Sequence, residues 1–272
     1  MTSPGLWNSI DEGEVDMTTQ VSPESELTRI PRLVGIGVGP GDPDLITIKA
    51  VQELENSDLI FVPSSETSLS DTGRAEAIIS AICPDVVNRI RRISFSMARN
   101  GEDRNQAWQS AAQDTINGFA SGAKTIAFAT VGDPSVYSTF SYLADIVRQE
   151  ITCEVSVIPG ITAMQALAAA RLTPLVEGQE VLALVPLTAG LDKFCDALDY
   201  ADTVVAYKIG RNLENVATML RDRNRMDTAV IGTDIGLSGE SIKALSEVED
   251  SVVPYFATVI IPPVRTHTGS RL

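Results

Sequence analysis

The stretch Leu33-Val34-Gly35-Ile36-Gly37-Val38-Gly39-Pro40-Gly41-Asp42-Pro43 decides the fold of this chain. Its first half is a short apolar run, which is typical of a buried strand, and its second half is a glycine and proline loop. After the loop, Ile48, Val51 and Leu54 recur at helical spacing and predict an amphipathic helix. The stretch therefore predicts a strand, a loop and a helix in this order.

The glycine loop differs from the common nucleotide-binding fingerprints. Counted from Gly35 and Gly37, the third glycine of a GxGxxG motif falls on Pro40, and the next predicted strand, 58–62, ends without the acidic residue that binds a ribose. A P-loop would need Gly-Lys-Ser or Gly-Lys-Thr, which is missing as well. We therefore expect neither a nicotinamide oxidoreductase nor a P-loop enzyme.

Strand and helix patterns alternate along the rest of the chain. This alternation is typical of α/β proteins with mostly parallel, helix-flanked sheets, whose ligands bind beyond the carboxyl ends of the strands. We expect a disordered acidic extension at 1–31, an N-terminal α/β domain at 32–175, a C-terminal α/β domain at 176–265 and a tail at 266–272. The predicted strands are 33–38, 58–62, 86–93, 124–129, 154–158, 181–185, 203–207, 228–231 and 255–261. The predicted helices begin near residue 48 and cover 74–83, 104–120, a segment from 136 to 146, a segment up to 171, 190–199 and 211–222.

Two further loops follow predicted strands of the first domain. One is Val131-Gly132-Asp133-Pro134-Ser135-Val136-Tyr137, and the other is Ile158-Pro159-Gly160-Ile161-Thr162-Ala163. Glycine lets backbone groups approach a ligand closely, and an aspartate can accept hydrogen bonds from it. The alternative interpretation is structural, with Asp133-Pro134 as an ordinary helix start and Thr162 as a helix cap. Three such loops at one sheet edge favour a binding pocket.

Composition limits the possible functions. A net charge of −15 and a pI near 4.4 argue against nucleic acid as a partner, since phosphate binding needs a basic face. His267 is the one histidine, which argues against histidine bases and a histidine-ligated metal, so no metal is expected. The cysteines are Cys83, Cys153 and Cys195, too far apart for a metal knuckle. The chain has no apolar run of the ~20 residues that span a bilayer and no signal-peptide pattern, so we expect a cytoplasmic protein without membrane contact.

Together the three loops resemble the tetrapyrrole methylase family, also called class III methyltransferases. The resemblance rests on GVGPGDPDLITIKA, TVGDPSVYSTFSYL and VIPGITAMQALAAARL in this order, and it spans residues 32–263. Further segments are similar to the precorrin-2 C20-methyltransferases of that family. They are 137–140, 95–99, 207–211 and 255–259.

The resemblance implies a fold of two βα domains with helix-flanked mixed sheets, with S-adenosylmethionine in a cleft between them. It implies C-methylation of a tetrapyrrole in cobalamin biosynthesis, from precorrin-2 to precorrin-3A, with S-adenosylhomocysteine as the second product and a homodimer as the assembly. The cofactor-binding residues would be Pro40, Val131, Gly132, Asp133, Val136, Thr162, Ala163, Tyr207, Lys208, Ile209 and Gly232. The substrate-binding residues would be Gly41, Asp42, Arg99, Ser138 and Thr139.

Methyl transfer from a sulfonium needs mainly alignment of the reacting atoms, because the leaving group is already activated. A proton must then leave the methylated carbon, and Tyr137 and Asp133 are the candidate catalytic residues. The substrate is a polycarboxylate, so an acidic enzyme must bind it through a local basic patch. Candidates are the arginines between Arg89 and Arg104, with Arg99 first because it lies in a family-like segment.

Several alternatives stay open. The substrate could be cobalt-factor II or another precorrin, or the chain could be a uroporphyrinogen III methylase, a diphthine synthase or a ribosomal RNA ribose methylase. A different class is a tetrapyrrole- or adenosine-binding protein without catalysis. Cofactor binding without methylation of any tetrapyrrole would favour that binding protein.

Overall fold

The computed structural model describes residues 30–64, 73–94, 101–249, 252–254, 256–265 and 269 of the 272-residue chain, without the side chains of 101–104. The chain separates into two units, Met1–Ile30 and Pro31–Leu272. All the helices and strands described below belong to the second unit. Segment 95–99 and Tyr255, which contributed to the family resemblance, lie outside the described residues.

The first sheet is wholly parallel and has the strand order β3-β2-β4-β1-β5. Its strands are β1 (Arg32–Gly37), β2 (Leu59–Ser64), β3 (Ile90–Ser94), β4 (Thr125–Thr130) and β5 (Glu154–Ile158). Strand β1 lies between β4 and β5, with Gly37 opposite Thr130 and Ile36 opposite Ile158. The loops that follow these strands therefore leave the sheet side by side.

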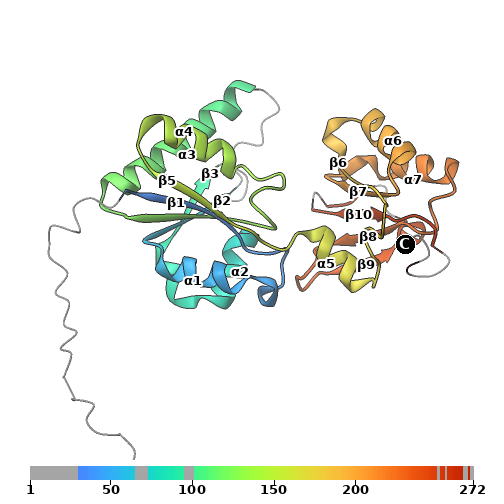
Figure 1. Ribbon diagram of the computed structural model, residues 1–272, viewed down its shortest axis with the longest axis horizontal. Helices are drawn as coiled ribbons and strands as arrows, with labels where there is room; N and C mark the ends of the chain where they lie inside the picture. Colours follow the sequence, from blue (N-terminus) through green and yellow to red (C-terminus); the bar gives the residue numbers. More distant parts are fainter. Residues whose placement is uncertain are drawn as a thin grey trace, which may run out of the picture. The chain divides into compact units, whose positions relative to one another are not determined.

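Helices cover both faces of the first sheet (Figure 1). Helices α1 (Ile48–Asn56) and α2 (Arg74–Ile82) pack on one face, and α3 (Gly101–Ala120) and α4 (Phe140–Glu150) pack on the other. Burial on both faces explains why the inner strands β1, β2 and β4 are mostly apolar instead of alternating. At Gly35 an added Cβ would lie 2.5 Å from the Phe140 ring, so glycine at this position lets α4 pack directly on β1.

The second sheet is mixed and has the strand order β6-β7-β10-β8-β9. Its strands are β6 (Leu182–Pro186), β7 (Thr203–Tyr207), β8 (Val230–Thr233), β9 (Ser241–Ala244) and β10 (Thr258–Ile261). Only the β6–β7 pair is parallel. Helices α6 (Leu191–Tyr200) and α7 (Leu213–Asp222) pack on one face, and α5 (Ala163–Ala170) packs on the other. Helix α5 therefore packs on the second sheet although it lies before residue 175, where the sequence predicts the boundary between the two domains. The boundary itself stays a prediction.

The structure corrects four details of the sequence prediction. The predicted strand 86–93 begins as a 3-10 helix (Pro84–Arg89), because Pro84 starts a helical turn. The helix expected from 136 begins only at Phe140, after a turn. Ile48 is 78% exposed, and Ala50 and Leu54 form the buried side of α1. The second sheet is not mostly parallel, and its edge strand β9 was missed because Ser-Ile-Lys-Ala is too short and too polar to stand out. Other 3-10 turns lie at Pro43–Leu45, Leu187–Ala189, Gly210–Asn212 and Leu245–Glu247.

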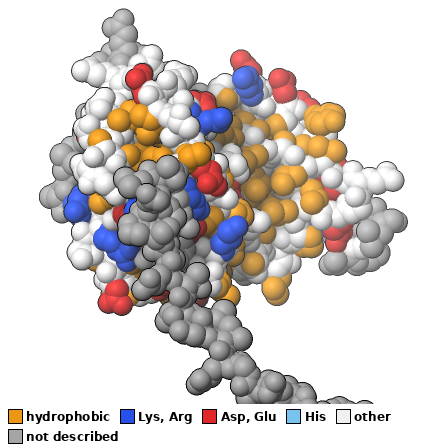
Figure 2. Space-filling model, turned by 60° about the vertical axis from the view of Figure 1, so that its left-hand side comes forward, with side chains coloured by type: hydrophobic (Ala, Val, Ile, Leu, Met, Phe, Trp, Pro, Cys, Tyr) orange, Lys and Arg blue, Asp and Glu red, His pale blue; other side chains and the backbone are white. Residues whose placement is uncertain are grey.

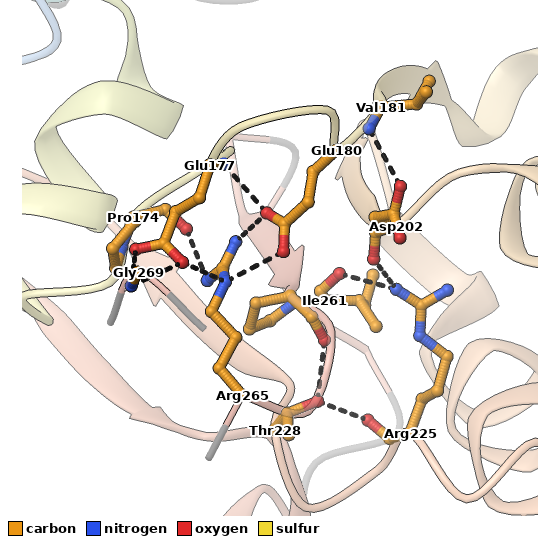
Figure 3. Close-up of polar contacts among 11 residues, drawn as sticks. Pro174, Glu177, Glu180, Val181, Asp202, Arg225, Thr228, Ile261, Arg265 and Gly269 are labelled. Atoms are coloured by element: carbon orange, nitrogen blue, oxygen red, sulfur yellow. Dashed lines mark hydrogen bonds and ion pairs between the residues drawn. The ribbon is translucent and has the colours of Figure 1, made fainter. Parts of the chain in front are cut away.

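A buried ionic cluster joins the segment before β6 to the segment after β10 (Figure 3). The Arg265 guanidinium contacts the carboxylates of Glu177 and Glu180 and donates a hydrogen bond of 3.0 Å to the Pro174 carbonyl. The side chains of Arg265, Glu177 and Glu180 are only 10%, 9% and 2% exposed. The Gly269 N–H donates to Glu177 as well, at 3.1 Å. The cluster therefore fixes the chain where it enters and leaves the second sheet.

Candidate functional site

Three loops meet at the carboxyl edge of the first sheet, as the sequence predicts. They are the β1 loop (38–42), the β4 loop (131–139) and the β5 loop (159–162). The Gly132 N–H donates a hydrogen bond of 2.8 Å to the Gly39 carbonyl, and the two residues form an isolated β-bridge. The β1 and β4 loops are therefore joined through their backbones.

The glycines of these loops allow the backbones to touch. A Cβ added to Gly37 would lie 2.5 Å from the carbonyl oxygen of Gly132, and a Cβ added to Gly160 would lie 2.2 Å from the same oxygen. Real Cβ atoms do not approach other atoms this closely. Gly132 itself has a φ of +73°, which favours glycine. An added Cβ at Gly132 would meet only the Thr162 Cα, at 3.9 Å. Packing thus requires glycine at Gly37 and Gly160, and the left-handed backbone favours glycine at Gly132.

Asp133 holds the β4 loop to the β5 loop. It is 7% exposed and accepts hydrogen bonds from the Ser135 N–H at 2.7 Å, from the Ser135 hydroxyl and from the Gly160 N–H at 2.9 Å. Burial by itself would raise the pKa of Asp133, but these hydrogen bonds outweigh burial and lower it below the usual aspartate value. The residue forms a turn with Ser135 and not the start of a helix. A carboxylate with these hydrogen bonds is a poor proton acceptor, and it stabilises the contact between the β4 and β5 loops.

Tyr137 and Tyr207 bring the two sheets together at this edge. Their rings pack edge to face with centroids 5.9 Å apart, and the Tyr137 hydroxyl donates to the Leu184 carbonyl at 3.4 Å. Tyr137 and Lys208 both adopt a positive φ, and the Lys208 ammonium lies 5.1 Å from the centre of the Tyr137 ring. Burial raises the pKa of Tyr137, so its phenol is protonated at neutral pH and does not accept a proton.

The start of α5 is fixed by its own side chains and by Tyr207. The Thr162 N–H and hydroxyl donate to the Gln165 side-chain oxygen at 2.9 and 3.0 Å, so Thr162 closes the first turn of α5. The Tyr207 hydroxyl accepts a hydrogen bond of 3.0 Å from the Met164 N–H. Burial raises the pKa of Tyr207, and the Met164 hydrogen bond opposes that shift. Ala163 is only partly buried beside these groups, at the first position of α5.

Thr258 is a buried residue that the sequence reasoning did not place in the site. It stands opposite Tyr207 on one neighbouring strand and opposite Gly232 on the other. Its side chain is fully buried, and its hydroxyl has no hydrogen-bond partner among the described residues. Only the strand register reveals this position, because Thr258 is distant in sequence from both neighbours. Ile209, another predicted cofactor residue, is fully buried in the core under α6 and α7, so its side chain serves packing.

The β1 loop also touches the loop that follows β8. An added Cβ at Gly41 would lie 2.2 Å from the Ile235 carbonyl oxygen, and one at Gly236 would lie 2.2 Å from the Asp42 nitrogen. Next to this contact is a hollow of about 430 Å³ between Asp42, α5 and the β8 loop. Asp42 borders the hollow, and its carboxylate accepts a hydrogen bond of 2.9 Å from the Asp44 N–H. Pro40 is buried in the same loop.

The remaining predicted site residues occupy the β4 loop or fall outside the described residues. Val131 and Val136 are both partly exposed at this edge. The Ser138 hydroxyl accepts a hydrogen bond of 3.2 Å from the Phe140 N–H, and Thr139 directly precedes α4. Arg99 lies outside the described residues.

The predicted basic patch is not continuous among the arginines that the structure describes. Arg89 donates to the carbonyls of Glu55 and Ser57 near the end of α1, whereas Arg92 pairs with Glu76 of α2. On the face drawn in Figure 2, lysine and arginine side chains lie in several separate places. Within the described ranges no three His, Cys, Asp or Glu residues are grouped as metal ligands. Searched over the same residues, none of the helices has the length and apolar character of a membrane span.

Comparisons with known proteins agree with the geometry. The family model described as Tetrapyrrole (Corrin/Porphyrin) Methylases matches residues 32–249. A precorrin-2 C(20)-methyltransferase of Sinorhizobium is 31% identical over 236 residues, which are 85% of this chain and 95% of that protein. A cobalt-precorrin-2 C(20)-methyltransferase of Salmonella typhimurium is 26% identical over 85% of this chain and 95% of its own length. The crystal structure of a Thermus thermophilus uroporphyrin-III C-methyltransferase, solved with S-adenosylhomocysteine, superimposes with a TM-score of 0.55 at 19% identity, covering 84% of this chain and 96% of that one.

Proposed function

The chain belongs to the tetrapyrrole methylase family, and from this premise we propose that it transfers a methyl group from S-adenosylmethionine to C20 of precorrin-2 or of its cobalt-containing form in cobalamin biosynthesis. The observation that carries the proposal is the likeness to C20-methyltransferases from both metal classes, which extends over both sheets. The fold supports it, because the loops that the family resemblance identified lie together at one sheet edge.

The residues at this edge fit S-adenosylmethionine. Gly132 has a left-handed backbone and lies next to Thr162, and a residue without a side chain at this junction suits the close approach of a ligand. The buried hydroxyl of Thr258, between Tyr207 and Gly232, lacks a partner among the described residues. When bound, the cofactor would supply an electrophilic methyl group on a sulfonium. We propose that it is held by Pro40, Val131, Gly132, Asp133, Val136, Thr162, Ala163, Tyr207, Lys208 and Gly232, with Ile209 supporting them from the core.

The role of these residues is to align and not to react. Asp133 fixes the β4 loop against the β5 loop, and Tyr207 fixes the start of α5 through the Met164 N–H. Such preorganisation is the main requirement of a displacement with an activated leaving group. The lowered pKa of Asp133 and the raised pKa of Tyr137 make both poor proton acceptors at neutral pH. We therefore infer that the proton of the methylated carbon leaves to water or to the substrate, and that Tyr137 orients the substrate.

The substrate would lie next to the β1 and β4 loops, near Gly41, Asp42, Ser138 and Thr139, with Arg99 as a further contact. A homodimer in the cytoplasm is the assembly that the family resemblance implies. Size-exclusion chromatography with light scattering tests the dimer directly, because the chain has a mass of 29.1 kDa.

An anaerobic assay with labelled S-adenosylmethionine tests the proposed function. Purified protein is offered precorrin-2 and cobalt-factor II in parallel, and mass spectrometry follows the label into the macrocycle. We expect one added methyl group, located at C20 by NMR, and the preferred ring assigns the metal class. Cofactor binding without transfer to either ring would contradict the proposal and would favour a binding protein.

A further inference from the structure

We propose that Arg74 binds a carboxylate of the tetrapyrrole and that Asp234 positions its guanidinium for this task. The inference rests on the proposed function, because it concerns how that substrate is recognised. It names a cation that neither the motifs nor the comparisons assign. It also addresses how a chain of charge −15 binds a polycarboxylate, which requires local positive charge.

Arg74 lies at the sheet edge that carries the candidate site. It is the first residue of α2, the helix that follows β2, so it lies at the carboxyl edge of the parallel sheet, where the three glycine loops also lie. Its partner Asp234 follows Gly232 by two residues and precedes Ile235, whose carbonyl touches Gly41. The pair therefore borders the residues proposed for both cofactor and substrate.

Two contacts orient the guanidinium of Arg74. Its Nη2 contacts Asp234 Oδ1, and its centre lies 4.3 Å from the centre of the Phe256 ring. Among the described residues, Nε and Nη1 of Arg74 make no hydrogen bond. The Arg74 side chain is 25% exposed. The fork is thus oriented by these two contacts, and with respect to the described residues its Nε and Nη1 remain as donors for a carboxylate, which guanidinium binds in a bidentate manner.

A purely structural role explains Arg74 poorly. A cation at the first position of a helix is disfavoured by the helix dipole, and Gly73 provides no side-chain cap. Ion pairs with this much exposure add little to stability, and the side chains of Arg74 and Asp234 are 25% and 31% exposed. The helix N-terminus and Arg74 both favour an anion at this place, and Asp234 neutralises only part of that field.

The test compares Arg74→Gln and Arg74→Lys with the control Arg223→Gln. Arg223 also pairs with an aspartate, Asp199, and its side chain is 24% exposed, so the control removes the same charge from a similar setting outside the proposed site. For each full-length variant, KM for the tetrapyrrole and kcat are measured anaerobically, the Kd of S-adenosylmethionine by calorimetry and Tm by scanning calorimetry. We expect Arg74→Gln to raise KM about tenfold, with kcat, cofactor Kd and Tm unchanged, and Arg74→Lys to recover part of the loss. Asp234→Asn should raise KM by a smaller factor of about three, since it leaves the cation in place but less well oriented.

Two outcomes would overturn the inference while the function stands. One is a KM of Arg74→Gln within twofold of the wild type. The other is that Arg74→Gln and Asp234→Asn both change the cofactor Kd, the Tm and the KM together. That result would show that the ion pair only stabilises the fold. If the wild-type protein methylates neither ring, the proposed function fails, and the inference fails with it.

Discussion

At the scale of single residues, Asp133 is a candidate catalytic residue in the sequence and a link between two loops in the structure. Its carboxylate accepts hydrogen bonds from the Ser135 and Gly160 N–H groups and from the Ser135 hydroxyl. The Gly160 bond joins two loops that are separated by a strand and a helix in sequence. No motif indicates that contact, although the Gly-Asp-Pro and Pro-Gly-Ile-Thr motifs each indicate a loop.

Asp133→Asn should therefore weaken both stability and cofactor binding. The amide cannot accept all of these hydrogen bonds, so we expect a loss of about 1–3 kcal/mol in the free energy of unfolding and a weaker affinity for S-adenosylmethionine. Urea denaturation and calorimetry measure the two effects, with Asp145→Asn on the exposed side of α4 as control. An Asp133→Asn protein that binds the cofactor normally but has lost turnover would instead support a catalytic carboxylate.

The lowered pKa of Asp133 also fixes the sign of its pH dependence. The carboxylate is more acidic in the folded protein than in the unfolded chain, so its stabilising effect is present above the unfolded pKa of about 4. The effect is lost as the pH falls through the folded pKa. The difference in stability between wild type and Asp133→Asn should therefore be constant near neutral pH and shrink in acid.

At the scale of helices and strands, the sequence predicted the first sheet better than the second. Strands buried on both faces are mostly apolar runs, and helices of regular period separate them, so β1, β2 and β4 are visible in sequence. In the second sheet β8, β9 and β10 pair antiparallel and are short, which gives a weak signal. The contact of α5 with β10 could not be predicted, because the residues of α5 continue the pattern of the first half.

The ionic cluster of Arg265 carries the main prediction at this scale. Arg265→Met leaves the carboxylates of Glu177 and Glu180 buried side by side, and we expect a loss of about 3–5 kcal/mol in the free energy of unfolding. Arg223→Gln is the control, because its partner Asp199 is 60% exposed and the loss should stay below about 1 kcal/mol. Thermal and urea denaturation compare the two variants.

A triple variant separates charge from packing in this cluster. Adding Glu177→Gln and Glu180→Gln to Arg265→Met removes the unpaired carboxylates and should restore much of the stability. Hydrogen bonds to Glu180, followed by nearby charges, raise the pKa of Arg265 despite its burial, so the arginine is charged at neutral pH. The stability that this shift contributes is lost only as the pH rises into the strongly alkaline range. Equal losses in the single and triple variants would show that packing alone matters.

At the scale of the whole molecule, the acidic composition limits the kinds of partner that we expect but does not identify the substrate. The charge of −15 argues against nucleic acid, and the described cations mostly serve internal contacts, as Arg89, Arg92 and Arg225 do. Family motifs identified the chemistry, whereas substrate recognition depends on pairs such as Arg74 and Asp234. These are 160 residues apart and meet only in the folded chain.

We predict that the proposed function does not need residues 1–28 of the N-terminal extension. The family match begins at residue 32, and the compact unit begins at Pro31, whose carbonyl accepts a hydrogen bond of 2.8 Å from the Glu154 N–H. Deleting residues 1–28 keeps this contact and all of β1. We therefore expect the kcat and KM of the truncated protein to stay within twofold of the wild-type values. Its Tm should stay within about 2 °C, a shift that corresponds to less than about 1 kcal/mol for a chain of this size. A large loss of turnover at unchanged Tm would place the extension in the site, whereas a loss that appears only on dilution would place it in the subunit interface.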